Sequence, residues 1–171
     1  MVNKMWNWND GTDVLMHHGI LGQKWGVRRY QNPDGTLTEA GKKKLHKQYD
    51  KRIKDVRDRI TSGQAMQDRW LKSYNAAADR MNNGLIDKYN SDYKKKLGNK
   101  AEGHDYLNDD EYNSGYEKLF NEIYRQEWNK QLKSDIYNDS GYKKIQKMID
   151  KYGEESLSDF AREGLKELED F

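Results

Sequence analysis

Apolar side chains recur every three or four residues through most of the chain after residue 38. The first such stripe is formed by Leu45, Tyr49, Ile53, Val56 and Ile60, at spacings of four, four, three and four. This is the period of an amphipathic α-helix. Thr38 suits the N-cap of this helix, and Glu39 lies where a negative charge favours the helix dipole. Thr61-Ser62-Gly63 could end the helix or only weaken a longer one, and the sequence leaves both possibilities open.

A second stripe follows the first, and its spacing predicts one further helix. Its members are Met66, Trp70, Tyr74, Ala77, Met81, Leu85, Tyr89 and Tyr93. Aromatic residues at helical spacing could stack on nucleobases, but the pattern is more typical of a thin hydrophobic core. Gly98-Asn99 and Gly103 interrupt the stripe and predict a loop that runs to about residue 109.

The remainder of the chain predicts three more helices. Asp109 or Asp110 is placed to cap a helix whose apolar residues are Tyr112, Tyr116, Leu119, Phe120, Ile123, Trp128 and Leu132. A turn at 138–141 and Gly153 bound a short helix, and Ser156 or Ser158 begins the last one. No β-rich run follows Leu37. We therefore predict an all-α body at 42–171, built as elongated antiparallel helical hairpins or a bundle.

The N-terminal part of the chain follows a different pattern. Residues 1–12 suit a flexible leader with two aromatic residues, Trp6 and Trp8, and residues 13–41 are rich in glycine. Asn32-Pro33-Asp34-Gly35 is a strong turn signal, which predicts a small hairpin packed through Trp25, Tyr30 and Leu37. The predicted organisation is a leader at 1–12, a docking module at 13–41 and the helical body at 42–171.

Composition and charge add two constraints. Only 34% of the residues are hydrophobic, so we expect a thin core. The net charge of +2 conceals a division, because residues 1–100 carry 21 Lys/Arg against 11 Asp/Glu, and the remainder carry 10 against 18. A basic front and an acidic back can indicate polyanion binding, head-to-tail assembly, internal pairing or merely solvated helix faces.

Catalytic and metal-binding signatures are few. The chain has no cysteine, so disulfides and thiolate zinc sites are excluded. It has no Gly-x-Ser-x-Gly elbow and no Walker or dinucleotide loop. Asp13, His17 and His18 could contribute metal ligands, and His46 and His104 could add to them only through the fold. Packing or docking roles are favoured for His17 and His18. We predict no enzymatic activity, cofactor or metal. The N-terminus lacks a signal-peptide core and no run approaches the ~18 apolar residues of a membrane span, so we expect a soluble intracellular protein.

Basic and aromatic residues gather in the predicted docking module. Lys24, Arg28, Arg29 and the triple lysine at 42–44 surround Trp25 and Tyr30. This arrangement could bind nucleic acid through phosphate contacts and base stacking. Trp, Tyr and Arg also dominate the hot spots of protein interfaces, and the balanced overall charge favours a protein partner.

The same stretch carries a resemblance. The residues that carry it form the pattern His17-His18-Gly19-Ile20-Leu21-Gly22-x-Lys24-Trp25-Gly26-Val27-Arg28-Arg29-Tyr30-Gln31-Asn32-x-Asp34-Gly35-x-Leu37-Thr38-x-Ala40-Gly41. This pattern resembles a short module in proteins of tailed phages and prophages of Gram-positive bacteria. In that family the module is attached to minor head or other virion-associated proteins and to small proteins of unknown role. It covers about 30 of the 171 residues, and Gln23 stands where methionine is expected.

The resemblance implies a phage genome and a partner shared by proteins that carry the module. We expect a non-enzymatic phage structural or virion-associated protein that docks on a capsid or other virion protein. A second copy of the chain is a further candidate partner, and the expected locations are the host cytoplasm and the virion. The expected docking residues are His17, His18, Lys24, Trp25, Arg28, Arg29 and Tyr30.

An alternative is a small phage-encoded inhibitor of a host defence nuclease, of the anti-CRISPR kind. Its acidic helices would stand in for DNA phosphates, through Asp109, Asp110, Glu111 and Glu117. Direct binding of nucleic acid through residues 24–44 is a third and less favoured hypothesis.

Overall fold

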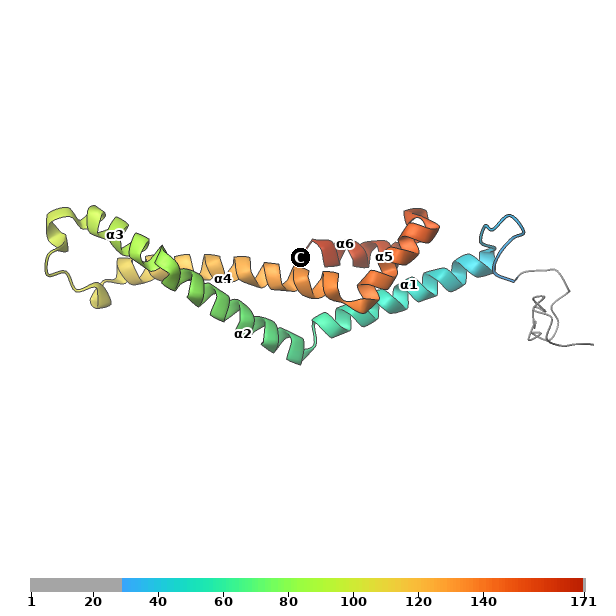
Figure 1. Ribbon diagram of the computed structural model, residues 1–171, viewed down its shortest axis with the longest axis horizontal. Coiled ribbons are helices and arrows are strands. Elements are labelled where there is room, and N and C mark those ends of the chain that lie inside the picture. The colour runs from blue at the N-terminus through green and yellow to red at the C-terminus, as the bar shows by residue number, and fades with distance from the viewer. Residues whose placement is uncertain (1–28, 171) are drawn as a thin grey trace, which may run out of the picture. The chain divides into compact units, whose positions relative to one another are not determined.

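The computed structural model describes residues 29–170, which belong to two units (Figure 1). The first unit runs to Lys42 and the second begins at Lys43. The predicted leader and residues 13–28 of the predicted docking module lie outside the described residues.

In the first unit, residues 29–42 form a tight turn followed by the start of a helix. Gln31 and Leu37 make an isolated antiparallel bridge, and the Asn32 N–H donates to the Thr36 carbonyl at 2.7 Å. Gly35 has φ of +89°, the left-handed conformation that favours glycine. Helix α1 (Glu39–Ile60) then begins, and the Gly41 N–H donates to Thr38 Oγ1 at 3.1 Å. This confirms Thr38 as the N-cap and places the first turn of α1 inside the predicted module.

In the second unit, the apolar stripe of α1 is buried as the spacing predicts. It packs against α5 (Ser140–Tyr152) and α6 (Asp159–Glu169). Gly164 of α6 leaves no room for a Cβ, since that atom would lie 2.6 Å from Ile53 Cγ2. The facing buried residues are Tyr142, Ile145, Leu157, Ala161, Leu165 and Leu168. The all-α prediction for the body is confirmed, and residues 29–170 contain no strand.

A second core lies between α2 (Gly63–Arg80) and α4 (Asp110–Asn138), with α3 (Ile86–Leu97) completing the hairpin. Ala77, Met81 and Ile123 form its centre. The open question at 61–63 is answered here, because α1 ends at Ile60 and Ser62 caps α2 by accepting from the Ala65 N–H at 3.3 Å. No helix of the described part of the chain is long and apolar enough for a membrane span.

The single helix predicted from the second stripe is wrong. A short π-type segment, Met81–Leu85, separates α2 from α3, and Gly84 within it has φ of +97°. The predicted thin core is also wrong for the first half of the stripe, because Met66, Trp70 and Tyr74 are exposed. The physical reason is that α4 covers the side of α2 that carries Arg69, Ser73 and Ala77.

Candidate docking site

Two of the seven predicted docking residues, Arg29 and Tyr30, lie within the described residues. His17, His18, Lys24, Trp25 and Arg28 lie outside them. The Arg29 side chain is exposed, and its guanidinium carbon lies 5.3 Å from the centre of the Tyr30 ring. This is a cation–π distance. The carbonyl groups of these two residues take part in the fold of the turn.

Those main-chain groups attach the turn to the start of α1. The Thr38 hydroxyl donates to the Arg29 carbonyl at 2.7 Å, and the Thr38 N–H donates to the Tyr30 carbonyl at 3.2 Å. A Cβ at Gly41 would collide with the Tyr30 carbonyl oxygen, so this position requires glycine. The helix can therefore begin directly against the chain that precedes the turn.

Side chains within the turn complete its hydrogen bonding. Asp34 Oδ1 accepts from the Thr36 N–H at 2.9 Å and from Thr36 Oγ1 at 2.7 Å, and these bonds lower the pKa of Asp34. The Asn32 amide donates to Thr36 Oγ1 at 2.8 Å. The part of the motif from Asn32 to Gly41 thus builds a local fold, and it leaves the Arg29 side chain at the surface.

The four acidic residues predicted for DNA mimicry have unequal environments. Asp109 caps α4 by accepting from the Glu111 and Tyr112 N–H groups at 2.9 and 3.0 Å. Asp110, Glu111 and Glu117 are exposed, and Glu111 pairs with Lys96. Asp109 is therefore the one carboxylate of the four that is committed to the fold.

Asp109 also joins a tyrosine cluster that the sequence analysis did not group. Its Oδ2 accepts from the Tyr93 hydroxyl at 2.7 Å and lies 2.6 Å from His104 Nε2. The Tyr112 N–H and then the Tyr93 hydroxyl lower the pKa of Asp109 to about 2, and the same carboxylate raises the pKa of Tyr93. Nearby, the Tyr89 hydroxyl donates to the Tyr112 carbonyl at 2.6 Å.

The sequence signal for this cluster is a glycine inside a helix. A Cβ at Gly115 would collide with the Tyr89 hydroxyl, so the glycine lets that ring reach the backbone of α4. The cluster connects α3, and the loop that follows it, to the start of α4.

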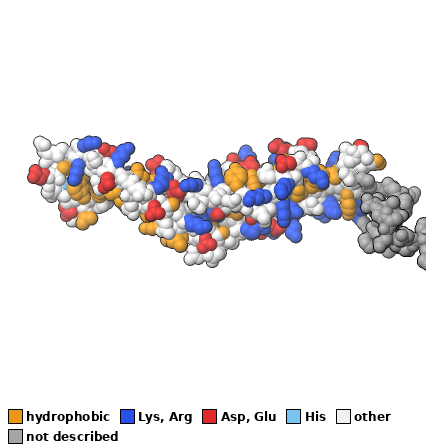
Figure 2. All heavy atoms as spheres, viewed as in Figure 1, with side chains coloured by type: hydrophobic (Ala, Val, Ile, Leu, Met, Phe, Trp, Pro, Cys, Tyr) orange, Lys and Arg blue, Asp and Glu red, His pale blue; other side chains and the backbone are white. Residues whose placement is uncertain are grey.

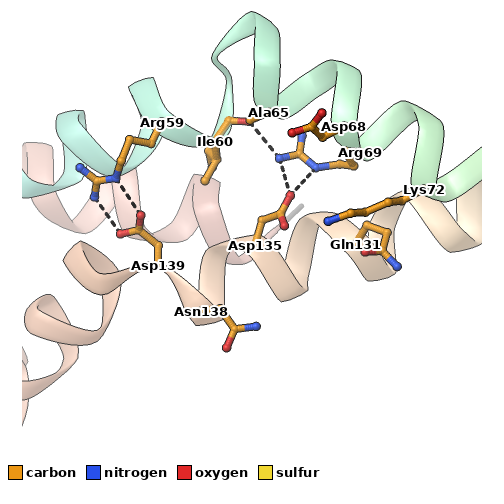
Figure 3. A pocket seen from close by; sticks show the side chains of 10 residues that line it. All are labelled: Arg59, Ile60, Ala65, Asp68, Arg69, Lys72, Gln131, Asp135, Asn138 and Asp139. Carbon is orange, nitrogen blue, oxygen red and sulfur yellow. Dashed lines mark hydrogen bonds and ion pairs between the residues drawn. The ribbon is translucent and has the colours of Figure 1, made fainter.

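A polar cleft of about 330 Å³ lies where the α1–α2 junction meets the C-terminal end of α4 (Figure 3). Arg59 donates from Nε and Nη2 to the two Asp139 oxygens, both at 2.8 Å. Arg69 is buried, and its Nε donates to Asp135 Oδ2 and its Nη2 to the Ile60 carbonyl, both at 2.9 Å. Because these cations and carboxylates satisfy one another, we interpret the cleft as a junction between helices.

A group of apolar side chains on α2 is exposed. Met66, Trp70, Leu71 and Tyr74 are exposed by 46, 50, 51 and 44%. Trp70 stacks on Tyr74 with 5.6 Å between ring centres, and Tyr74 meets the edge of Phe120 at 5.4 Å. In Figure 2, hydrophobic side chains reach the surface along the part of the molecule that α2 occupies. Exposed clusters of this kind mark interaction surfaces.

Among residues 29–170, no group of three or more His, Asp or Glu side chains is arranged to hold a metal ion. The sequence candidates Asp13, His17 and His18 lie outside this range. His46 and His104 lie within it, and neither belongs to such a group.

Comparison with known proteins gives one match. Residues 9–32 match the model of a family described only as of unknown function, DUF7211. The matched segment is 24 of the 171 residues, and it contains all seven predicted docking residues, from His17 to Tyr30. The comparisons with curated proteins and with solved structures give no match.

Proposed function

We propose that the protein is a non-enzymatic phage structural or virion-associated protein that acts by docking. The N-terminal module binds a capsid or other virion protein, and the helical body mediates assembly. The observation that carries the proposal is that all seven expected docking residues fall in a segment that matches a known family model, residues 9–32. The resemblance of that segment to modules of virion-associated proteins supplies the class of partner.

The geometry of the turn supports a docking role. The hydrogen bonds of the Asp34 and Thr38 side chains hold the chain after Tyr30, while the Arg29 guanidinium stays exposed. A segment ordered before binding loses less conformational entropy on association. Arginine and aromatic side chains presented in this way are the residue types that contribute most to interface hot spots.

The proposal is tested with the full-length chain, tagged at its C-terminus, in cells that carry the phage or prophage. We expect affinity capture to recover a head or other virion protein, and mass spectrometry to detect the chain in purified particles. The double variant Trp25→Ala/Arg28→Ala should capture at least about ten times less partner, since truncating a hot-spot side chain costs more than ~1.4 kcal/mol of binding free energy.

The matched control is Trp8→Ala/Lys4→Ala, which removes the same kinds of side chain just before the segment of family similarity. It should capture the partner as the parent chain does. Absence of the chain from purified particles, with no virion protein captured, would overturn the proposal.

A second candidate, inhibition of a host defence nuclease, is supported by the acidic balance after residue 100. In this case the full chain should capture a basic host nuclease in a salt-sensitive way. The neutralising set is Asp110→Asn, Glu111→Gln and Glu117→Gln, and it leaves Asp109 intact because that residue caps α4. Binding that is unchanged by this set would rule out DNA mimicry.

Direct nucleic-acid binding, the third hypothesis, predicts a steep salt dependence of affinity that falls when Arg28 and Arg29 are replaced by alanine. An affinity that does not change with salt concentration would exclude direct nucleic-acid binding.

A further inference from the structure

The charged residues of α2 all lie on one side of the helix. At about 100° per residue, its five charged side chains fall within a sector of roughly 120°. They are Asp68, Arg69, Lys72, Asp79 and Arg80. The remaining sector of about 240° carries no charge, although 35% of the residues in the chain are charged.

Helix α4 covers only part of this uncharged sector. Ser73 and Ala77 are fully buried against it, next to the buried Arg69. A run of exposed, uncharged residues remains beside them, which we name the α2 face: Met66, Gln67, Trp70, Leu71, Tyr74 and Asn75. An ordinary surface helix places its charges on the solvent side. The exposed surface of α2 is divided: its charges lie in one sector, and the α2 face beside it is uncharged and mostly apolar, so this face has the character of an interface.

We infer that the α2 face binds a second copy of this chain, in an antiparallel helix pair with its two-fold axis at Trp70. This dimer rests on the proposed function, in which the helical body mediates assembly, and the α2 face is the surface through which that assembly would occur. In a two-fold dimer the same patch meets itself, so any charge near the axis would face a like charge. The absence of charge from the α2 face removes this repulsion, which is the usual obstacle to self-association in a highly charged chain.

The antiparallel arrangement follows from the order of side chains along the face. With Trp70 on the axis, Met66 of each chain lies opposite Tyr74 of the other. Both pairings bring a thioether against an aromatic ring, a favourable contact. The two Trp70 rings meet at the centre. The helix dipoles run antiparallel, which is the favourable arrangement, because the positive end of each helix lies beside the negative end of the other.

The size of the face predicts a weak dimer. Since a large aromatic side chain carries about 150–250 Å², the half-exposed Trp70 and Tyr74 offer roughly 200 Å² per chain. The half-exposed Met66 and Leu71 add slightly less, which brings the total to at most roughly 400 Å². Two copies would bury at most roughly 800 Å² of apolar surface, and the flanking amides bring the total near the ~1,200 Å² of small specific interfaces. We therefore expect a dissociation constant in the micromolar range.

The first test is sedimentation velocity of the full-length chain from about 1 to 100 μM, a range that brackets a micromolar constant. We expect a reversible monomer–dimer equilibrium. Trp70→Lys, and independently Leu71→Lys, should weaken it at least about tenfold, because each places two like charges near the axis. Circular dichroism establishes that each variant keeps its helical content.

The matched control is Phe160→Lys on α6, where the side chain is also 50% exposed but lies outside the α2 face. This variant should dimerise as the parent chain does. A chain that stays monomeric over the whole range overturns the inference, and so does a dimer that neither lysine on the face weakens.

The orientation is tested by cross-linking, since the chain has no native cysteine. Met66→Cys and Tyr74→Cys are prepared separately and treated with a short bismaleimide, alone and as an equal mixture. The antiparallel pair predicts more covalent dimer in the mixture than in either variant alone. Cross-linking of each variant alone, without gain on mixing, overturns the antiparallel arrangement.

These results are separable from those of the docking proposal. Capture of a virion protein depends on residues near Trp25, whereas self-association depends on Trp70 and Leu71. A monomer that still captures its partner leaves module docking standing and removes only the dimer.

Discussion

Asp139 joins three helices, and its replacement gives a prediction with a calculable size. The residue ends α4 and caps α5, where its Oδ1 accepts from the Gly141 and Tyr142 N–H groups at 2.7 and 3.0 Å. The same carboxylate accepts two hydrogen bonds from Arg59, near the end of α1. One side chain therefore contributes a helix cap and an ion pair.

The two contributions can be estimated separately. Loss of an N-cap side chain costs about 1 kcal/mol of unfolding free energy. The ion pair is worth about 0.5 kcal/mol, because the Arg59 side chain is half exposed and its charge is screened by water. Asp139→Ala should therefore cost about 1.5 kcal/mol in total. Asp139→Ser, which keeps a capping oxygen but no charge, should cost only about 0.5 kcal/mol.

The assay is urea unfolding followed by far-UV circular dichroism, with Arg59→Gln used to close a double-mutant cycle. For a chain of this size, about 1.5 kcal/mol corresponds to a fall in Tm of roughly 3–6 °C. We expect a coupling energy of about 0.5 kcal/mol between Asp139 and Arg59. If Asp139→Ser were as destabilising as Asp139→Ala, the capping argument would be refuted.

Three other perturbations give clear expectations. Gly115→Ala should lower the unfolding free energy by about 1–2 kcal/mol, because the new Cβ collides with the Tyr89 hydroxyl. The control is Gly63→Ala, which has open space around it and should be neutral or stabilising. Urea unfolding measures both variants. The pKa of Asp109 is lowered to about 2, so its charged form stabilises the fold fully above about pH 4, and this contribution disappears as the pH falls toward 2. Acid titration of Asp109→Asn should lack that part of the transition, and an unchanged acid limb would contradict the assignment. Gly41→Ala should weaken capture of the module's partner while the unfolding midpoint of the body stays the same, and undiminished capture would show that the turn geometry is dispensable.

Helix boundaries were predictable where a short side chain satisfies the first backbone N–H groups. Thr38 caps α1 as the sequence predicts, and Asp109 and Ser158 are each one of the two cap residues that the sequence allowed for α4 and α6. The stripe of α1 was predictable for a related reason, because only one side of that helix is apolar. Local spacing is sufficient when a helix has a single face that can be buried.

The second stripe shows where this reasoning fails. Helix α2 has more uncharged surface than one neighbour can cover, so the sequence does not decide which part α4 occupies. The burial of Arg69, which pairs with Asp135 66 residues later in the chain, depends on that tertiary choice. The break at Gly84 had a local signal in Asn82-Asn83-Gly84, but the apolar period continues across it. Because the apolar residues keep the same helical spacing on both sides of Gly84, the spacing alone cannot reveal the kink.

The described part of the docking module shows which of its residues build the turn. Asp34 and Thr38 are occupied by hydrogen bonds within the turn, and Gly41 is required by the nearby Tyr30 carbonyl. A resemblance carried by these positions indicates a shared local fold, and it says nothing of a shared partner. We propose that partner recognition depends on Trp25, Arg28 and Arg29, and this proposal can be tested separately from the turn. Capture that is lost with Trp25→Ala/Arg28→Ala but retained with Gly41→Ala would assign recognition to the side chains alone, and loss with both would show that the turn must also present them.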